Sequence, residues 1–302
     1  METMYKTPPR NDAFCALHSA LSFAFYVVVL AVTMLVLHPA YLAISLCSAA
    51  AYLAALDTPR GLLRRLRWVL PLMVITVFFN AMFSHRGMTV LFYLRNGNAV
   101  TLESIVFGLL ASVMLAATVL WFASLHIVLT SEKLMAVTGR LAPALSLLLS
   151  MALRFVPRIS RQIKRTAQAQ RALYPPAGLS DRLRFGVRVL SVTVSVALEN
   201  AVVTADSMRS RGYGLPGRTA FRRERWGARE RGFAALFVPL AAVVLAGLLA
   251  GRAAANFYPS LDFAAPDALG AASRAAFTLL CNLPLLLNRK EALTWRRLRS
   301  NI

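Results

Sequence analysis

Acidic residues and cysteines are scarce in this sequence of 302 residues. Only 13 aspartates and glutamates stand against 34 lysines and arginines, which leaves a formal net charge of +21. The three cysteines, Cys15, Cys47 and Cys281, lie far apart in apolar segments and form no Cys-x-x-Cys pair. Because Cys15 and His18 would supply at most two metal ligands, neither a disulfide framework nor a zinc site is predicted. The cysteines are interpreted as small apolar packing residues.

Motifs for catalysis are missing as well. The sequence has no G-x-x-x-x-G-K-[ST] loop, the usual cradle for the phosphates of ATP. Its apolar segments contain no paired carboxylates and only scattered histidines, His18 and His126, whereas a proton relay needs several such groups. A membrane-embedded lipid-modifying enzyme would need a general base or a metal-binding carboxylate; in the body of the second predicted helix Glu199 and Asp206 are the only candidates, and no further acid joins them. No catalytic residue, metal site or cofactor is therefore predicted.

Apolar residues make up 58% of the chain and charged residues only 16%, with a mean hydropathy of +0.58. A water-soluble domain of this size needs more polar surface. Apolar runs of membrane length predict about six transmembrane helices. They cover residues 14–37, 40–56, 68–84, 104–129, 233–251 and 271–288. The predicted fold class is an all-α, polytopic integral membrane protein.

Arginine is distributed unevenly over the connections between these runs. Residues 57–67 carry Arg60, Arg64, Arg65 and Arg67, and the C-terminal tail is also basic, whereas 85–103 and 252–270 are poor in positive charge. The protein is predicted to lie in the cell membrane. Because cytoplasmic loops retain Lys and Arg, both of its termini are predicted to lie in the cytoplasm. Three regions follow: transmembrane helices in 1–129, a cytoplasmic or interfacial region in 130–232, and C-terminal helices with a basic tail in 233–302.

The middle region holds half of the basic residues of the chain, within 154–231. Its charges follow helical periodicity, since Phe155, Ile159 and Ile163 recur every four residues. After a break at "YPPAGLS" a second helix is predicted from about Ser180 to Gly212. Its apolar stripe comprises Leu183, Val187, Leu190, Val194, Leu198, Ala201, Ala205 and Met208. This pattern predicts a pair of long amphipathic helices, which suit anionic lipid or a cytoplasmic protein. Nucleic acid is not a predicted partner, because no recognition fold is present.

The stretch "ADSMRSRGYGLPGRT", residues 205–219, carries a resemblance to a known family. Together with "MALRFVPRISRQIKRTAQAQRA" at 151–172, and more loosely residues 80–109, it resembles the transmembrane T component of energy-coupling factor transporters. These are prokaryotic uptake systems for vitamins and metals. T components carry two cytoplasmic coupling helices, each ending in a motif centred on arginine, typically Ala-Arg-Gly. The second motif corresponds here to Ser210, Arg211 and Gly212.

The first motif departs from the family pattern. Where Ala-Arg-Gly is expected, the chain has Ala172-Leu173-Tyr174, and the nearest arginine is Arg171. Either Arg171 substitutes from a shifted helix turn, or this end docks by apolar contact through Leu173 and Tyr174. Arg171 and Ala172 are the candidate residues of this first site.

The resemblance implies a coupling subunit that is not itself an enzyme. Its expected partners are two cytoplasmic ABC-type ATPase subunits, a small membrane subunit that binds a vitamin or a metal ion, and the lipid bilayer. ATP hydrolysis would belong to the ATPase subunits. The alternatives are a membrane-embedded lipid-modifying enzyme and a basic membrane scaffold protein.

Overall fold

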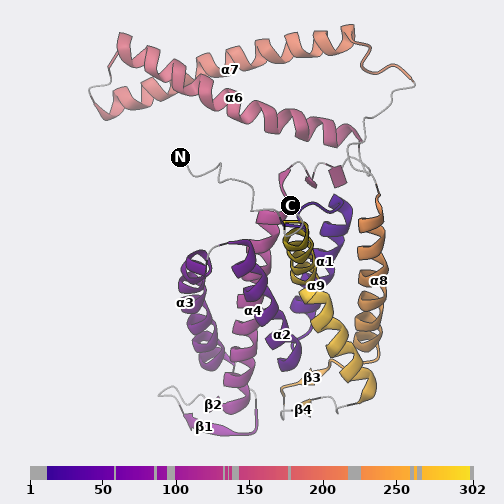
Figure 1. Cartoon of the computed structure of the whole chain (residues 1–302). Helices are drawn as coiled ribbons and strands as arrows, with labels where there is room; N and C mark the ends of the chain where they lie inside the picture. Colours follow the sequence, from indigo (N-terminus) through magenta and orange to yellow (C-terminus); the bar gives the residue numbers. More distant parts are fainter. Residues whose placement is uncertain are drawn as a thin grey trace. The chain divides into compact units, whose positions relative to one another are not determined.

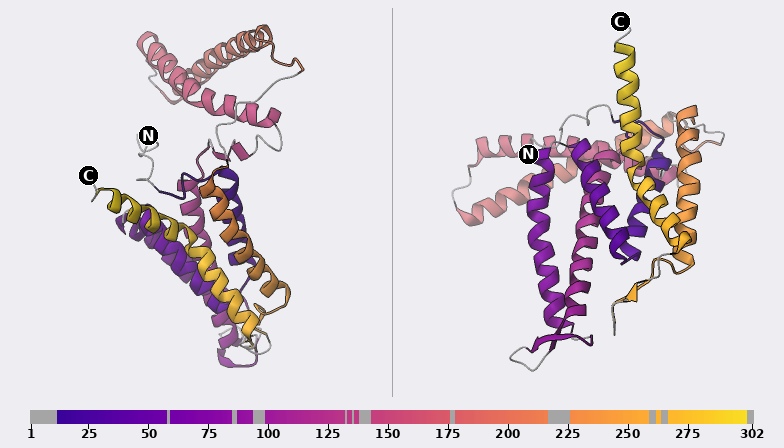
Figure 2. Two further views of the ribbon diagram at one scale, coloured as in Figure 1. Left: turned by 45° about the vertical axis from the view of Figure 1, so that its right-hand side comes forward. Right: turned by 60° about the horizontal axis from the view of Figure 1, so that its bottom comes forward.

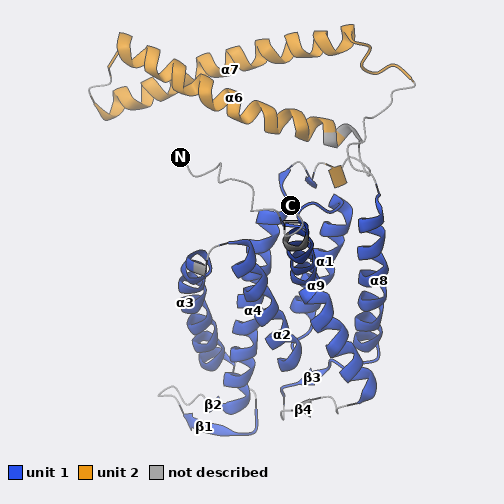
Figure 3. Ribbon diagram, in the orientation of Figure 1, with its two compact units in different colours: residues 1–134, 224–302 blue, residues 135–223 orange. Residues whose placement is uncertain are grey.

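A computed structural model of the chain describes residues 12–57, 59–84, 87–93, 99–131, 133–134, 136–137, 143–175, 178–216, 226–258, 262–263 and 267–299 (Figure 1). The chain divides into two compact units (Figure 3). One comprises Met1–Leu134 and Glu224–Ile302, and we call it the membrane unit. The other comprises Met135–Arg223, and we call it the hairpin unit.

The membrane unit is a bundle of helices with two small strand pairs. Its helices are α1 (Ser19–Leu35), α2 (Pro39–Leu56), α3 (Pro59–Phe83), α4 (Leu102–Val128), α8 (Ala228–Leu249) and α9 (Ala268–Arg299). Each predicted apolar run overlaps one of these helices. Short antiparallel pairs follow α3 and α8: β1 (Val90–Tyr93) with β2 (Ala99–Thr101), and β3 (Ala255–Asn256) with β4 (Asp262–Phe263). The prediction of a helical, multi-pass membrane protein is confirmed.

Two boundaries predicted from the sequence are wrong. The arginine-rich segment 57–67 is not a loop, because α3 begins at Pro59 and carries these arginines in its first turns. The run 14–37 is not helical from its start, because α1 begins only at Ser19, where the His18 side chain accepts a hydrogen bond from the Ala20 N–H. Residues 13–17 form turns ahead of it. Within the described ranges, six helices are long and apolar enough to cross a membrane, and they are α2, α3, α4, α7, α8 and α9. The apolar helix α1, with 17 residues, is shorter.

Aromatic rings and a few hydroxyl groups fill the centre of the bundle. The fully buried Phe14 packs edge-on against Phe25, Tyr26 and Tyr52, with ring centroids 5.1–6.2 Å apart. Trp121 Nε1 donates a hydrogen bond to Ser45 Oγ over 3.0 Å. Polar contacts of this kind hold helices together where lipid offers no polar alternative. Together with the aromatic contacts, this bond joins α1, α2 and α4 into one core.

Small residues allow two further pairs of helices to approach closely. Gly247 of α8 faces Ser273 of α9, and a Cβ at position 247 would overlap the Ser273 side chain. Ser273 Oγ in turn accepts a hydrogen bond of 2.8 Å from the Tyr41 hydroxyl of α2. Gly108 of α4 lies against Val77 and Asn80 of α3. The backbones therefore meet directly at these points.

Helix α3 lies at the edge of the bundle beside α4 (Figure 2). Most of its large apolar side chains are exposed: Leu63, Trp68, Val74, Ile75, Phe78, Phe79 and Phe83. In a helix that can span a membrane, such a surface faces lipid or another membrane protein.

The hairpin unit consists of two long helices, α6 (Pro143–Leu173) and α7 (Leu179–Ser210). The apolar residues 143–153 and the basic residues after them belong to one helix, since α6 continues past Pro157. Helix α7 begins at Leu179, close to the predicted start at about Ser180, and its N-cap is Gly178.

Candidate functional site

The helices α6 and α7 pack against each other along one side of α7. Val189 and Thr193 of α7 are buried, and Arg158 of α6 donates a hydrogen bond of 3.2 Å to Asn200 Oδ1. A cavity of about 200 Å³, lined by both helices, lies near this bond. The contact ties the two helices together near their middle.

The apolar stripe predicted for α7 lies on a different side of that helix. Five of its members, Leu183, Val187, Leu190, Val194 and Leu198, are 47–70% exposed. Helix α7 therefore has two apolar faces, one packed on α6 and one uncovered within the described residues. Exposed apolar surface of this extent marks an interaction site.

The end of α7 has a defined geometry at the predicted second motif. The Gly212 N–H donates to the Arg209 carbonyl over 2.9 Å, and the Tyr213 N–H donates to the Met208 carbonyl over 3.0 Å. Gly212 has φ +76°, in the left-handed region that favours glycine. These three features make up the Schellman motif, which stops a helix at a fixed residue. Glycine at position 212 is thus required by the backbone as well as by any close approach of a partner.

Arg211 lies at this helix end with its side chain exposed. Among the described residues, no hydrogen bond or ion pair engages its guanidinium group. The neighbouring Ser210 hydroxyl is engaged, since it donates to the Asp206 carbonyl over 2.9 Å. As far as the described residues go, the five N–H donors of Arg211 are thus without a partner at the end of α7.

The end of α6 is organised differently. The guanidinium carbon of Arg171 lies 5.7 Å from the ring centroid of Phe185, and that of Arg188 lies 5.2 Å from the ring centroid of Tyr174. These two cation–π contacts brace α6 and α7 across the break between them. Leu173 and Tyr174 are 69% and 64% exposed, and Ala172 is exposed beside them. Arg171 thus lies against Phe185 of α7, and the exposed side chains at the end of α6 include the apolar groups of Leu173 and Tyr174.

The acids considered for catalysis are isolated. Glu199 and Asp206 are both exposed on α7. The described part of the chain contains no group of three or more His, Cys, Asp and Glu side chains that could hold a metal ion. The described acids of the hairpin unit therefore form no group suited to metal-assisted chemistry.

Comparison with known proteins gives two similar sequences. The chain is 32% identical over 106 residues to the energy-coupling factor transporter transmembrane protein EcfT of Bacillus selenitireducens, covering 34% of this chain and 40% of that protein. It is 34% identical over 100 residues to the protein of the same name from Exiguobacterium sibiricum, covering 32% and 38%. The match thus spans about two fifths of the length of these relatives. No family model matches the chain. The two relatives confirm the resemblance to T components.

Proposed function

We propose that this chain is the transmembrane coupling subunit of an ATP-driven uptake transporter of the energy-coupling factor type. It would link two cytoplasmic ABC-type ATPase subunits to a small membrane subunit that binds a vitamin or a metal ion. The observation that carries the proposal is Arg211, which lies exposed at the fixed end of α7 without an ion pair or side-chain hydrogen bond to any described residue, in a chain similar to EcfT. Ser210 and Gly212 complete this docking site.

The chemistry of Arg211 suits a groove on a partner protein. A planar guanidinium can form two parallel hydrogen bonds to one carboxylate, which fixes orientation as well as position. The Schellman end holds the arginine at a constant distance along α7. A movement of the partner groove would therefore displace the whole helix.

The end of α6 would bind the second ATPase subunit in another way. Arg171 lies over the ring of Phe185, and the exposed Leu173 and Tyr174 are the apolar groups at this end. We propose apolar docking at this end, with Arg171 and Ala172 shaping it.

The exposed stripe of α7 is suited to the third partner. Its leucines and valines form a surface without charge, which fits a membrane-embedded subunit better than a soluble ATPase. Displacement of α7 would then reach the substrate-binding subunit directly.

Copurification tests the proposal. The tagged chain, extracted from its own membranes in mild detergent, is expected to bring down ATPase subunits with phosphate-binding loops and one small membrane protein. The isolated chain should hydrolyse no ATP, because its sequence has no phosphate-binding loop. If no ATPase subunit copurifies with the chain under several mild extraction conditions, the proposal is contradicted. ATP hydrolysis by the chain alone would contradict it as well.

The orientation is a separate prediction. On the proposed topology, both termini and the hairpin unit lie in the cytoplasm. A cysteine introduced by Tyr93→Cys then lies outside the cell, and one introduced by Tyr174→Cys lies inside. Both side chains are well exposed, at 70% and 64%. In a Cys47→Ala background, an impermeant maleimide applied to intact cells should label position 93 and spare position 174. Labelling with the opposite preference would show that the orientation is reversed.

A further inference from the structure

The turns that precede α1 lie inside the membrane unit. We call residues 12–18 the clasp. Phe14 at its centre is fully buried and contacts the rings of Phe25, Tyr52 and Phe233, which belong to α1, α2 and α8. The clasp is therefore anchored in the core of the bundle.

A buried carboxylate fixes the start of the clasp. Asp12 Oδ2 accepts a hydrogen bond of 3.0 Å from the Tyr52 hydroxyl and one of 3.4 Å from the Cys15 thiol. Burial raises the pKa of Cys15 to about 12, so the thiol keeps its proton and acts as the donor. This bond pattern ties the clasp to α2.

The chain leaves the membrane unit beside the clasp. Leu134 is the last residue of the membrane unit before the hairpin unit begins. Directly before it, Lys133 donates hydrogen bonds from its ammonium group to the carbonyl of Cys15 over 2.5 Å and to that of Leu17 over 3.5 Å. The outgoing connection is therefore held by the clasp backbone.

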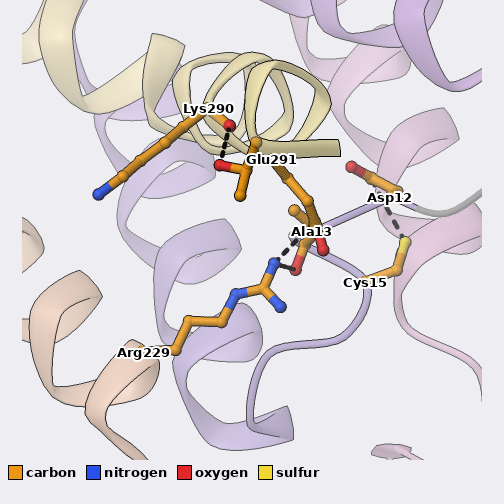
Figure 4. A network of polar contacts seen from close by, with 7 residues as sticks. Asp12, Ala13, Cys15, Arg229, Lys290 and Glu291 are labelled. Carbon is orange, nitrogen blue, oxygen red and sulfur yellow. Dashed lines mark hydrogen bonds and ion pairs between the residues drawn. The ribbon is translucent and has the colours of Figure 1, made fainter. Parts of the chain in front are cut away.

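The chain also returns to the membrane unit at the clasp. Arg229, in the first turn of α8, donates to the Ala13 carbonyl over 3.3 Å and pairs with Glu291 of α9 over 2.9 Å (Figure 4). Just before α8, the ring of Trp226 lies 5.4 Å from that of His18. The incoming connection is thus held by the same seven residues.

We infer that Lys133 and Arg229 are positioning residues, through which movement of the hairpin unit reaches the membrane core. Both connections are bound to the clasp, and the clasp packs among α1, α2 and α8. A displacement of either connection is therefore transmitted through the clasp to the aromatic core, and not only to the end of one helix. The inference rests on the proposed function, since it assigns the path by which coupling would travel.

Hydrogen exchange in the assembled complex tests this path without knowledge of the substrate. Complexes of the chain with its ATPase subunits are prepared in lipid nanodiscs, either free of nucleotide or trapped with ATP and vanadate. In the wild type, trapping should change exchange at least threefold in peptides from α6 and α7 and in peptides from α1 and α2. Lys133→Met, Arg229→Met and the double variant should keep the response of α6 and α7 and reduce that of α1 and α2 at least threefold.

Matched variants separate positioning from a general loss of charge. Lys133→Arg and Arg229→Lys keep a donor and should retain at least half of the response. Arg252→Met removes an arginine of similar exposure, paired with Asp267 away from the clasp, and should behave as wild type.

Three results would overturn the inference: a full response of α1 and α2 in the Met variants, no such response in the wild type, or failure of the Met variants to accumulate where Arg252→Met accumulates. The last result would mean that the contacts serve folding only. Absence of ATPase subunits from the wild-type preparation would instead overturn the proposed function itself.

Discussion

Arg211→Ala is expected to weaken binding of the ATPase subunits at least about 30-fold and to stop transport with it. Truncating an arginine that is desolvated against charged partners costs about 2–5 kcal/mol, because those partners are left unpaired. A contact with anionic lipid would contribute only about 1 kcal/mol. The measurement is the amount of ATPase that copurifies with the chain at matched membrane expression.

Two further variants separate a docked arginine from a general surface charge. Arg209→Ala removes an arginine two residues away in the last turn of α7 and should have a mild effect. Arg211→Lys should recover binding only in part, because an ammonium group cannot reproduce the two-pronged geometry of guanidinium. If all three variants bind the ATPase subunits equally, Arg211 is one charge among many and the docking proposal fails.

Gly247→Leu is expected to separate α8 from α9. Position 247 has no room for even a Cβ beside Ser273, and the displaced serine would lose its bond with Tyr41. Overpacking of this kind costs about 3 kcal/mol, which corresponds to a fall in melting temperature of about 6–12 °C. Thermal unfolding of the detergent-extracted protein measures this fall in melting temperature.

The same helix provides the control. Gly232 also lies in α8, but a Cβ there would meet nothing within 4 Å. Gly232→Leu should therefore leave the melting temperature within about 2 °C of the wild type, since isolated surface changes have small effects. Equal losses for the two variants would mean that leucine at any α8 position is harmful, and that close packing at Gly247 is not the cause.

The sequence was sufficient to predict the fold class and the helices, because membrane spans depend on composition over about 20 residues. The break between α1 and α2 falls between the predicted runs 14–37 and 40–56, where Pro39 begins α2, since proline favours the first turn of a helix. The end of α7 near Gly212 followed from glycine in the same way. These are local signals that one stretch of chain carries by itself.

The contacts that organise the site could not be predicted. Both faces of α7 are apolar, so periodicity alone did not indicate which one packs on α6. Arg171 meets Phe185 across a break in the chain, and Lys133 meets the carbonyl of Cys15 from 118 residues away. The latter contact uses a backbone acceptor, which every residue possesses and no sequence pattern marks.

The composition of α7 matters already during biosynthesis. The insertion machinery meets α7 as a segment long and apolar enough to be threaded through the bilayer. On the proposed topology, insertion of α7 would force α8 to enter from the opposite side and would leave the C-terminal tail outside the cell. Arginines flank the apolar stretch at both ends: Arg182, Arg184 and Arg188 before it, and Arg209 and Arg211 after it. Because translocation of arginine is disfavoured, we expect these residues to hold both ends of α7 inside until α8 is inserted. Replacing them together would thus produce chains with an inverted C-terminal half, before any partner subunit is met.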